Sequence, residues 1–220
     1  MERINFYNLI IIDQSGSMYS IYDSTLSTIN ETLQSIRNTQ KESPEINQIV
    51  SIVTFSGEGF HNIRTVRNMV PVSEIEDLTK SDYCPNGNTP LYDAIGQSVY
   101  SLSGAISKES VVMVTIITDG YENSSKEYSA LSVSTLIDVL RKYGWTFAFI
   151  GANQDATLSA RELNISNAMD FEATDRGVKR MGDRYRTALD KISKRILWKV
   201  ENNDVDSLYS DDMQDVFDNS

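Results

Sequence analysis

The sequence is poor in the residues that build disulfide scaffolds and nucleophilic relays. Its 220 residues include one cysteine, Cys84, one histidine, His61, and four prolines. A single cysteine excludes an internal disulfide and is typical of a reducing compartment, so we expect the protein to be cytoplasmic. A lone histidine also argues against a Ser-His-Asp catalytic relay.

Long hydrophobic runs are missing as well. The longest apolar-rich run, Val111 to Ile117, is far shorter than the roughly 20 residues that a membrane-spanning helix needs. The apolar stretch from Ile4 to Ile12 follows Glu2 and Arg3 and ends without a small-residue cleavage site, which does not match a signal peptide. The sequence therefore predicts no association with membranes.

Positive charge is scarce, since 20 basic residues face 31 acidic ones and the net charge is −11. The segment 201–220 holds seven acids and no base, which predicts a flexible acidic tail after a domain of residues 1–200. Nine bases gather in 176–199, and we interpret them as a solvated helix face near that tail. Because phosphate binding needs a net basic surface, we expect no nucleic acid as a partner.

Short apolar segments typical of strands alternate along the chain with segments of helical period. This alternation predicts one α/β domain with a doubly wound, mostly parallel sheet and helices on both faces. The run 60–66 alternates like an antiparallel edge strand. Strands are predicted over 5–12, 49–55, 60–66, 111–118, 145–150 and 168–171, and helices over 18–40, 91–106, 131–143, 156–163 and 175–198.

Two of the most apolar predicted strands end in an aspartate, Asp13 and Asp119. Ligands of open doubly wound sheets bind beyond the carboxyl ends of the strands, where the strand order reverses. If these two strands are neighbours, their carboxylates share one crevice. The loop after Asp13 adds the hydroxyls of Ser15 and Ser17, and a loop before a predicted helix adds that of Thr89.

Oxygen donors of this kind select Mg²⁺, Mn²⁺ or Ca²⁺ over zinc or copper. Mg²⁺ keeps several waters and needs few protein ligands. Hydroxyls bound directly, with the carboxylates acting partly through water, would leave one position open for a Glu or Asp of another protein. The residues therefore favour a protein-binding site over a closed structural one, and we expect no enzymatic activity.

These residues resemble the metal-ion-dependent adhesion site of the von Willebrand factor A family, which is Asp-x-Ser-x-Ser, then a distant Thr, then an Asp after a buried strand. The resemblance covers roughly Ile4 to Lys199 and implies a six-stranded Rossmann-like sheet with one antiparallel edge strand. It also implies Mg²⁺-dependent protein binding, here in the assembly or regulation of an intracellular complex. Segments 87–95 and 151–156 look like those of stand-alone bacterial or phage members. The matching positions, without departure, are Asp13, Ser15, Ser17, Thr89 and Asp119.

Two other functions stay open at this point. One is a metal-dependent hydrolase, although no general base is committed to that task and no phosphate-binding Gly-x-x-x-x-Gly-Lys-[Ser/Thr] loop or Gly-x-Ser-x-Gly elbow is present. The other is a structural subunit whose metal site is unused.

Several further residues near the predicted site receive ordinary interpretations. Asp155 is predicted to cap the following helix, and Cys84 to be a free thiol without function. Glu122 and Asn123 are interpreted as solvated loop residues. We expect the isolated domain to be a monomer.

Overall fold

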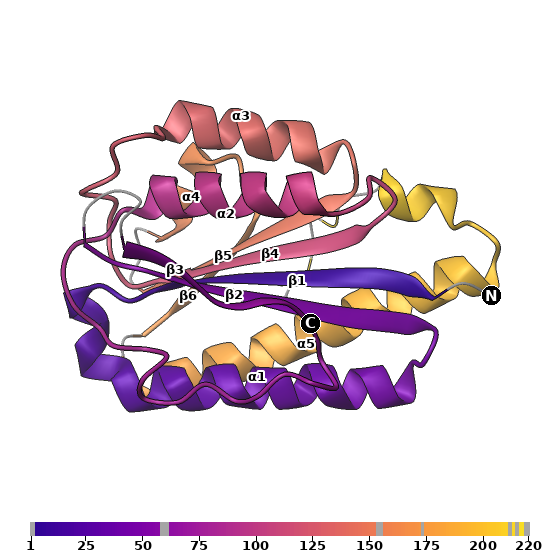
Figure 1. Cartoon of the computed structure of the whole chain (residues 1–220), viewed down its shortest axis with the longest axis horizontal. Helices are drawn as coiled ribbons and strands as arrows, with labels where there is room; N and C mark the ends of the chain where they lie inside the picture. Colours follow the sequence, from indigo (N-terminus) through magenta and orange to yellow (C-terminus); the bar gives the residue numbers. More distant parts are fainter. Residues whose placement is uncertain are drawn as a thin grey trace.

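A computed structural model describes residues 3–57, 62–152, 156–172, 174–210, 213 and 216–217. Its centre is a six-stranded sheet with the order β3-β2-β1-β4-β5-β6, in which only β2 and β3 pair antiparallel (Figure 1). The predicted mostly parallel sheet with one antiparallel edge strand is confirmed. The strands are β1 (Ile4–Asp13), β2 (Ile46–Phe55), β3 (Ile63–Pro71), β4 (Val111–Thr118), β5 (Trp145–Ala152) and β6 (Asn167–Phe171).

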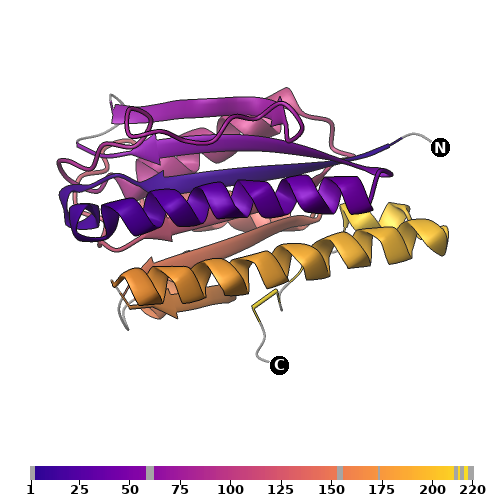
Figure 2. The ribbon, with the colours of Figure 1, turned by 90° about the horizontal axis from the view of Figure 1, so that it is seen from below.

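Helices cover both faces of this sheet. Helices α1 and α5 lie side by side on one face, as Figure 2 shows, and α2, α3 and α4 cover the other. Each face buries its own apolar core, so successive residues of a central strand serve opposite cores: Ile10 packs with the α1 and α5 side, Ile11 with the other. The helices are α1 (Tyr22–Glu42), α2 (Leu91–Ala105), α3 (Ala130–Arg141), α4 (Ala156–Glu162) and α5 (Asp175–Glu201), with 3₁₀ turns η1 (Gly16–Ile21) and η3 (Asp206–Tyr209).

The strand order reverses between β1 and β4. The chain moves outward from β1 through β2 to β3, and then returns to β4 and moves outward the other way through β5 to β6. Strands β1 and β4 are parallel neighbours whose last paired residues are Ile12 and Ile117. The carboxyl ends that carry Asp13 and Asp119 therefore meet at the switch point, as the sequence predicts.

The first predicted helix begins later than its sequence pattern suggests. The turn η1 precedes α1, which starts at Tyr22, and η1 buries Met18 and Ile21. These two side chains anchor the turn in the core. Ser17, which lies between β1 and Met18 in the sequence, is exposed. The edge strand β3 also begins at Ile63, and the first residues of the predicted strand, His61 among them, lie outside the described residues.

The acidic C-terminal segment, predicted as a flexible tail, contacts the domain through several of its described residues. Leu208, Val216 and Phe217 are buried in the same core as α1 and α5. The backbone N–H of Met213 donates to Thr146 Oγ1 over 3.1 Å, and that of Val216 to Asn167 Oδ1 over 3.1 Å. Apolar residues spaced between the aspartates thus attach this segment to the domain.

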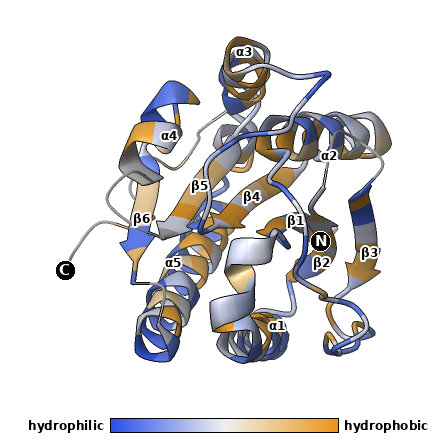
Figure 3. Cartoon of the chain, turned by 90° about the vertical axis from the view of Figure 1, so that its left-hand side faces the viewer, coloured by the Kyte–Doolittle hydropathy of each residue, from blue (hydrophilic) through white to orange (hydrophobic). Residues whose placement is uncertain are grey.

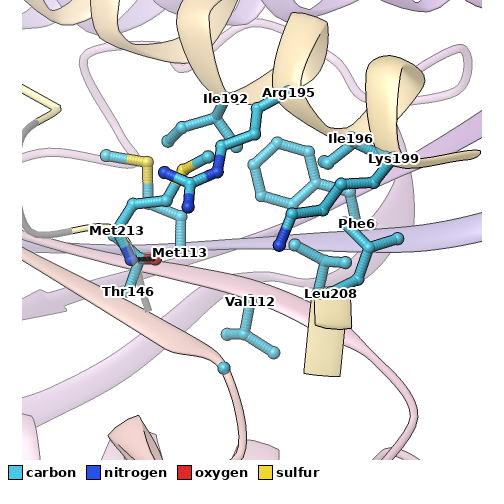
Figure 4. A pocket seen from close by; sticks show the side chains of 12 residues that line it. Phe6, Val112, Met113, Thr146, Ile192, Arg195, Ile196, Lys199, Leu208 and Met213 are labelled. Atoms are coloured by element: carbon cyan, nitrogen blue, oxygen red, sulfur yellow. Dashed lines mark hydrogen bonds between the residues drawn. The ribbon is translucent and has the colours of Figure 1, made fainter. Parts of the chain in front are cut away.

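A small cavity of about 20 Å³ lies beneath this segment, between α5 and the starts of the strands. Leu208 and Met213 line it, and Arg195 and Lys199 of α5 extend toward it, as Figure 4 shows. The ammonium of Lys199 donates to the backbone oxygen of Ser207 over 3.2 Å. The cavity has room for about one water molecule and lies at the end of the sheet opposite Asp13, so it is part of the attachment of the C-terminal segment.

None of the helices in the described ranges is long and apolar enough to cross a bilayer.

Candidate metal centre

Asp13, the last residue of β1, is fully buried and held by hydrogen bonds on both carboxylate oxygens. Its Oδ1 accepts from the backbone N–H of Ser15 over 2.6 Å, and its Oδ2 accepts from the hydroxyl of Thr118 over 2.6 Å. The Tyr83 hydroxyl donates to the backbone oxygen of Asp13 over 2.9 Å. The carboxylate is therefore fixed at the end of the strand, facing the loop that follows.

The two serines of this loop link it to the loop after β4. Ser15 Oγ lies 3.1 Å from Ser17 Oγ, and Ser17 Oγ donates to Asp119 Oδ1 over 2.6 Å. Ser17 and Asp119 are 102 positions apart in the sequence. The predicted neighbours from the two loops thus share a continuous set of oxygens.

Thr89 completes the group, as the position of Gly120 shows. A Cβ atom placed on Gly120 would lie 3.2 Å from Thr89 Oγ1, 3.6 Å from Asp13 Oδ2 and 3.7 Å from Ser17 Oγ. Oxygens from two loops therefore lie around this position in the third loop, and the absence of a side chain at residue 120 keeps the space between them open. The structure brings all five predicted side chains together at the end of the molecule seen in Figure 3.

Backbone hydrogen bonds hold the Thr89 loop against the loop after β1. The N–H of Gly16 donates to the oxygen of Gly87 over 3.0 Å, and the N–H of Asn86 donates to the oxygen of Gln14 over 2.8 Å. Gly87 has a φ of 67°, a left-handed conformation that glycine adopts without strain. The spacing of the oxygens is thus built into paired backbone segments.

Burial raises the pKa of Asp13 to about 6, against an ordinary value of 3.8. Hydrogen bonds from Thr118 and Ser15 oppose this effect in part, whereas the nearby charge of Asp119 adds to it. Burial also raises the pKa of Asp119, although the hydrogen bond from Ser17 works against this. Two desolvated carboxylates side by side are unfavourable alone, and a divalent cation between them would remove that cost.

The donor chemistry fits a hard cation. Among the described residues, no group of three or more His, Cys, Asp or Glu side chains is arranged to hold a metal ion. A cation at this centre would therefore depend on the hydroxyls of Ser15, Ser17 and Thr89 as well as on two carboxylates. Neutral hydroxyls and few carboxylates suit Mg²⁺, which retains water ligands, better than zinc.

Several supporting residues are not evident from the sequence. The side-chain oxygen of Asn123 accepts from the Thr89 N–H over 2.9 Å, and the Asn123 N–H donates to the Thr89 oxygen over 3.1 Å. Glu122 accepts from the N–H of Tyr92 over 2.9 Å and from that of Ser125 over 2.6 Å. The interpretation of these two residues as solvated loop positions was incomplete, because they tie the loop after β4 to the start of α2.

Two other residues were predicted to lie near the site, Cys84 and Asp155, and the structure describes no part for either in this network. Cys84 is a free, exposed thiol whose Sγ donates to the backbone oxygen of Lys80. Asp155, predicted to cap α4, lies outside the described residues. Tyr83 would have been hard to find from sequence because it adjoins no predicted ligand, whereas Thr118 and Gly120 adjoin Asp119.

The family model for the von Willebrand factor type A domain matches residues 9–181, a span that contains all five of these side chains. The chain belongs to the von Willebrand factor type A domain family. No curated protein matches the sequence. Domains of this family are typically protein-interaction modules.

Solved structures share the fold at low sequence identity. The PilB minor pilin from Streptococcus sanguinis is 10% identical with a TM-score of 0.62, and the match covers 89% of this chain and 63% of that one. The pilus adhesin SpaC from Lactobacillus rhamnosus GG is 11% identical with a TM-score of 0.65, covering 89% of this chain and 30% of that one. The SpRpn10 VWA domain is 12% identical with a TM-score of 0.55, and the match covers 78% of this chain and 90% of that one. The chain thus spans less than two thirds of the two pilus proteins.

Proposed function

We propose that this von Willebrand factor A domain binds Mg²⁺ at an intact adhesion site and captures an acidic side chain of a partner protein. The observation that carries the proposal is the space beside Gly120, which is within 3.7 Å of oxygens from Asp13, Ser17 and Thr89. Asp119 is joined to the same set through Ser17 over 2.6 Å. Ser15 adds a fifth side chain next to Ser17.

The chemistry of the site explains why a carboxylate would bind. A Mg²⁺ ion held mainly by neutral hydroxyls keeps most of its positive charge and several exchangeable waters. The carboxylates of Asp13 and Asp119 are oriented by hydrogen bonds from Thr118 and Ser17, and they would act on the cation partly through water. An acidic side chain from another protein then supplies the strongest available ligand for the open position.

A binding role is favoured over the two alternatives. A hydrolase would need a general base near the metal-bound water, and Asp13 is buried while Asp119 is engaged by Ser17. A structural subunit with an unused site would have no need to keep an open space lined by the buried carboxylate of Asp13 and the partly buried one of Asp119. We further propose that the domain is monomeric by itself and acts in an intracellular complex, in keeping with its single cysteine.

Calorimetric titration with Mg²⁺ and selection from a displayed library of random peptides test this proposal. We expect wild-type protein to bind Mg²⁺, and Mg²⁺-dependent peptides to contain a Glu or Asp without which binding is lost. Asp119→Ala should abolish both, whereas Asp190→Ala, which removes a surface acid paired with Lys194, should leave both intact. Wild-type protein that does not bind Mg²⁺, or that selects no Mg²⁺-dependent peptide, would refute the proposal.

Gly120→Ala is expected to lower the affinity for Mg²⁺ by roughly tenfold to a hundredfold, because its methyl group would enter the space between Thr89 Oγ1 and the other oxygens. Gly104→Ala is a matched control, since an added Cβ there meets nothing within 4 Å. Calorimetry on both variants, with circular dichroism to verify folding, measures the difference. Equal Mg²⁺ affinity in the two variants would mean that the cation does not bind in this space.

A further inference from the structure

Two tyrosines close in sequence to candidate metal ligands are largely exposed. Tyr19 is 74% exposed and lies in η1, two residues after Ser17. Tyr121 is 59% exposed and lies two residues after Asp119. Each of the two loops that contribute a surface-facing ligand therefore also carries an exposed aromatic ring at the same spacing.

The hydrogen bond between these ligands brings the two tyrosines into one region. Ser17 Oγ and Asp119 Oδ1 are 2.6 Å apart, so the loops touch at that point. Residues two positions along a chain are separated by at most about 7 Å, so each tyrosine is anchored within reach of the same small area. The distance from each tyrosine to its neighbouring ligand is one that a peptide segment of a few residues spans. This area lies at the end of the domain that faces the viewer in Figure 3.

The other exposed large hydrophobic residues of the described chain do not share this position. Most lie on the outer faces of helices, as Tyr100 does on α2 and Leu131 on α3. Scattered single residues of this kind are normal on protein surfaces. Tyr19 and Tyr121 differ from them because each lies two residues after a predicted metal ligand.

Tyrosine is suited to such a position for two reasons. It buries a large rigid surface with little loss of side-chain entropy, which is why tyrosine is enriched among residues that dominate binding energy. Apolar contacts around a metal-bound carboxylate also exclude water, and the lower local polarity strengthens the electrostatic attraction between cation and carboxylate.

We propose that Tyr19 and Tyr121 determine specificity at this site by contacting apolar residues on either side of the partner's metal-binding Glu or Asp. The proposal rests on the proposed function and names the partner chemistry as an acidic side chain flanked by apolar or aromatic ones. Neither tyrosine is a metal ligand in this account. Replacing the two tyrosines should therefore weaken the binding of the partner and leave the affinity for Mg²⁺ unchanged.

The displayed random-peptide library, selected on wild-type protein in Mg²⁺, tests this inference. The enriched peptides should carry apolar or aromatic residues within a few positions of the essential acid. An enriched peptide should bind the double variant Tyr19→Ser, Tyr121→Ser at least about tenfold more weakly, with Mg²⁺ affinity unchanged. Tyr100→Ser, at an exposed fraction of 69% on α2, is the matched control and should bind like wild type. The double variant with phenylalanine at both positions should retain most of the affinity.

The outcomes separate this inference from the proposed function. Acidic peptides without apolar neighbours, or a serine double variant that binds the enriched peptide like wild type, would overturn the role of the tyrosines and leave metal-dependent capture intact. A serine double variant that has also lost Mg²⁺ binding would overturn it too, since the rings would then support the metal site itself. Failure to select any Mg²⁺-dependent peptide would refute the proposed function, and the inference with it.

Discussion

Asp13→Asn should raise the free energy of unfolding of the metal-free protein at pH 7 by about 3 kcal/mol and abolish its stabilisation by Mg²⁺. Burial raises the pKa of Asp13 from 3.8 to about 6, so the ionised carboxylate is costly in the folded state. The gap between these pKa values corresponds to about 3 kcal/mol. An asparagine keeps an oxygen for the Ser15 N–H and is neutral, but it cannot supply the charge that a cation needs. Chemical denaturation in chelator and in Mg²⁺ measures both effects.

The stability of wild-type protein and of Asp13→Asn should depend differently on pH. Because the pKa of Asp13 is higher in the folded state, its contribution to stability is fully present below about pH 4 and is lost as the pH rises through about 6. In chelator, wild-type protein should therefore lose stability relative to Asp13→Asn between these pH values, and the difference should level off above them. A constant difference in stability across this range would show that the carboxylate is not desolvated as described.

Leu208→Ala is expected to destabilise the protein by about 3 kcal/mol, because this side chain of the acidic C-terminal segment is only 5% exposed and packs in the core beneath α5. Leu131→Ala serves as control. Leu131 is 76% exposed on α3, and its truncation should change the free energy of unfolding by less than about 0.5 kcal/mol. Urea denaturation of both variants provides the comparison.

The Leu208 variant also separates the C-terminal segment from the metal centre. The segment packs at the end of the sheet opposite Asp13, so Mg²⁺ affinity should be unchanged in Leu208→Ala. A variant as stable as the wild type would indicate that the segment is detached in solution, as its acidic composition alone suggests.

The sheet could be predicted closely from sequence because its central strands are buried on both faces. The run 111–118, for example, consists of apolar and β-branched residues that are all buried, and its predicted ends are those of β4. Helical period located α2, α3 and α5 in the same way. The start of α1 was misplaced because a 3₁₀ turn that buries Met18 has nearly the same spacing of apolar residues as an α-helix.

Composition alone does not indicate that apolar residues of the C-terminal segment pack against the domain. Seven acids without a base suggest disorder, yet Leu208, Val216 and Phe217 are spaced so that they enter the core together. Burial of a few apolar side chains depends on whether a surface exists to receive them. That surface, formed by α5 and the starts of β4 and β5, is a tertiary feature.

In the candidate site, too, some residues could be predicted from sequence and others depend on the tertiary fold. The spacing of Asp13, Ser15 and Ser17 in one loop and the strand-end position of Asp119 identify oxygens that must converge if the strands are neighbours. The supporting hydrogen bonds from Tyr83 and Asn123 follow no such rule, since their partners lie far away in sequence and are fixed only by the fold.

Anomalous diffraction from crystals grown with Mn²⁺ as a substitute for Mg²⁺ tests the central claim most directly. We predict one anomalous peak beside Gly120, at bonding distance from the hydroxyls of Ser15, Ser17 and Thr89, with at least one coordination position held by water or by a carboxylate from a neighbouring molecule. A peak elsewhere, no peak at saturating Mn²⁺, or an ion fully enclosed by protein ligands would contradict the account.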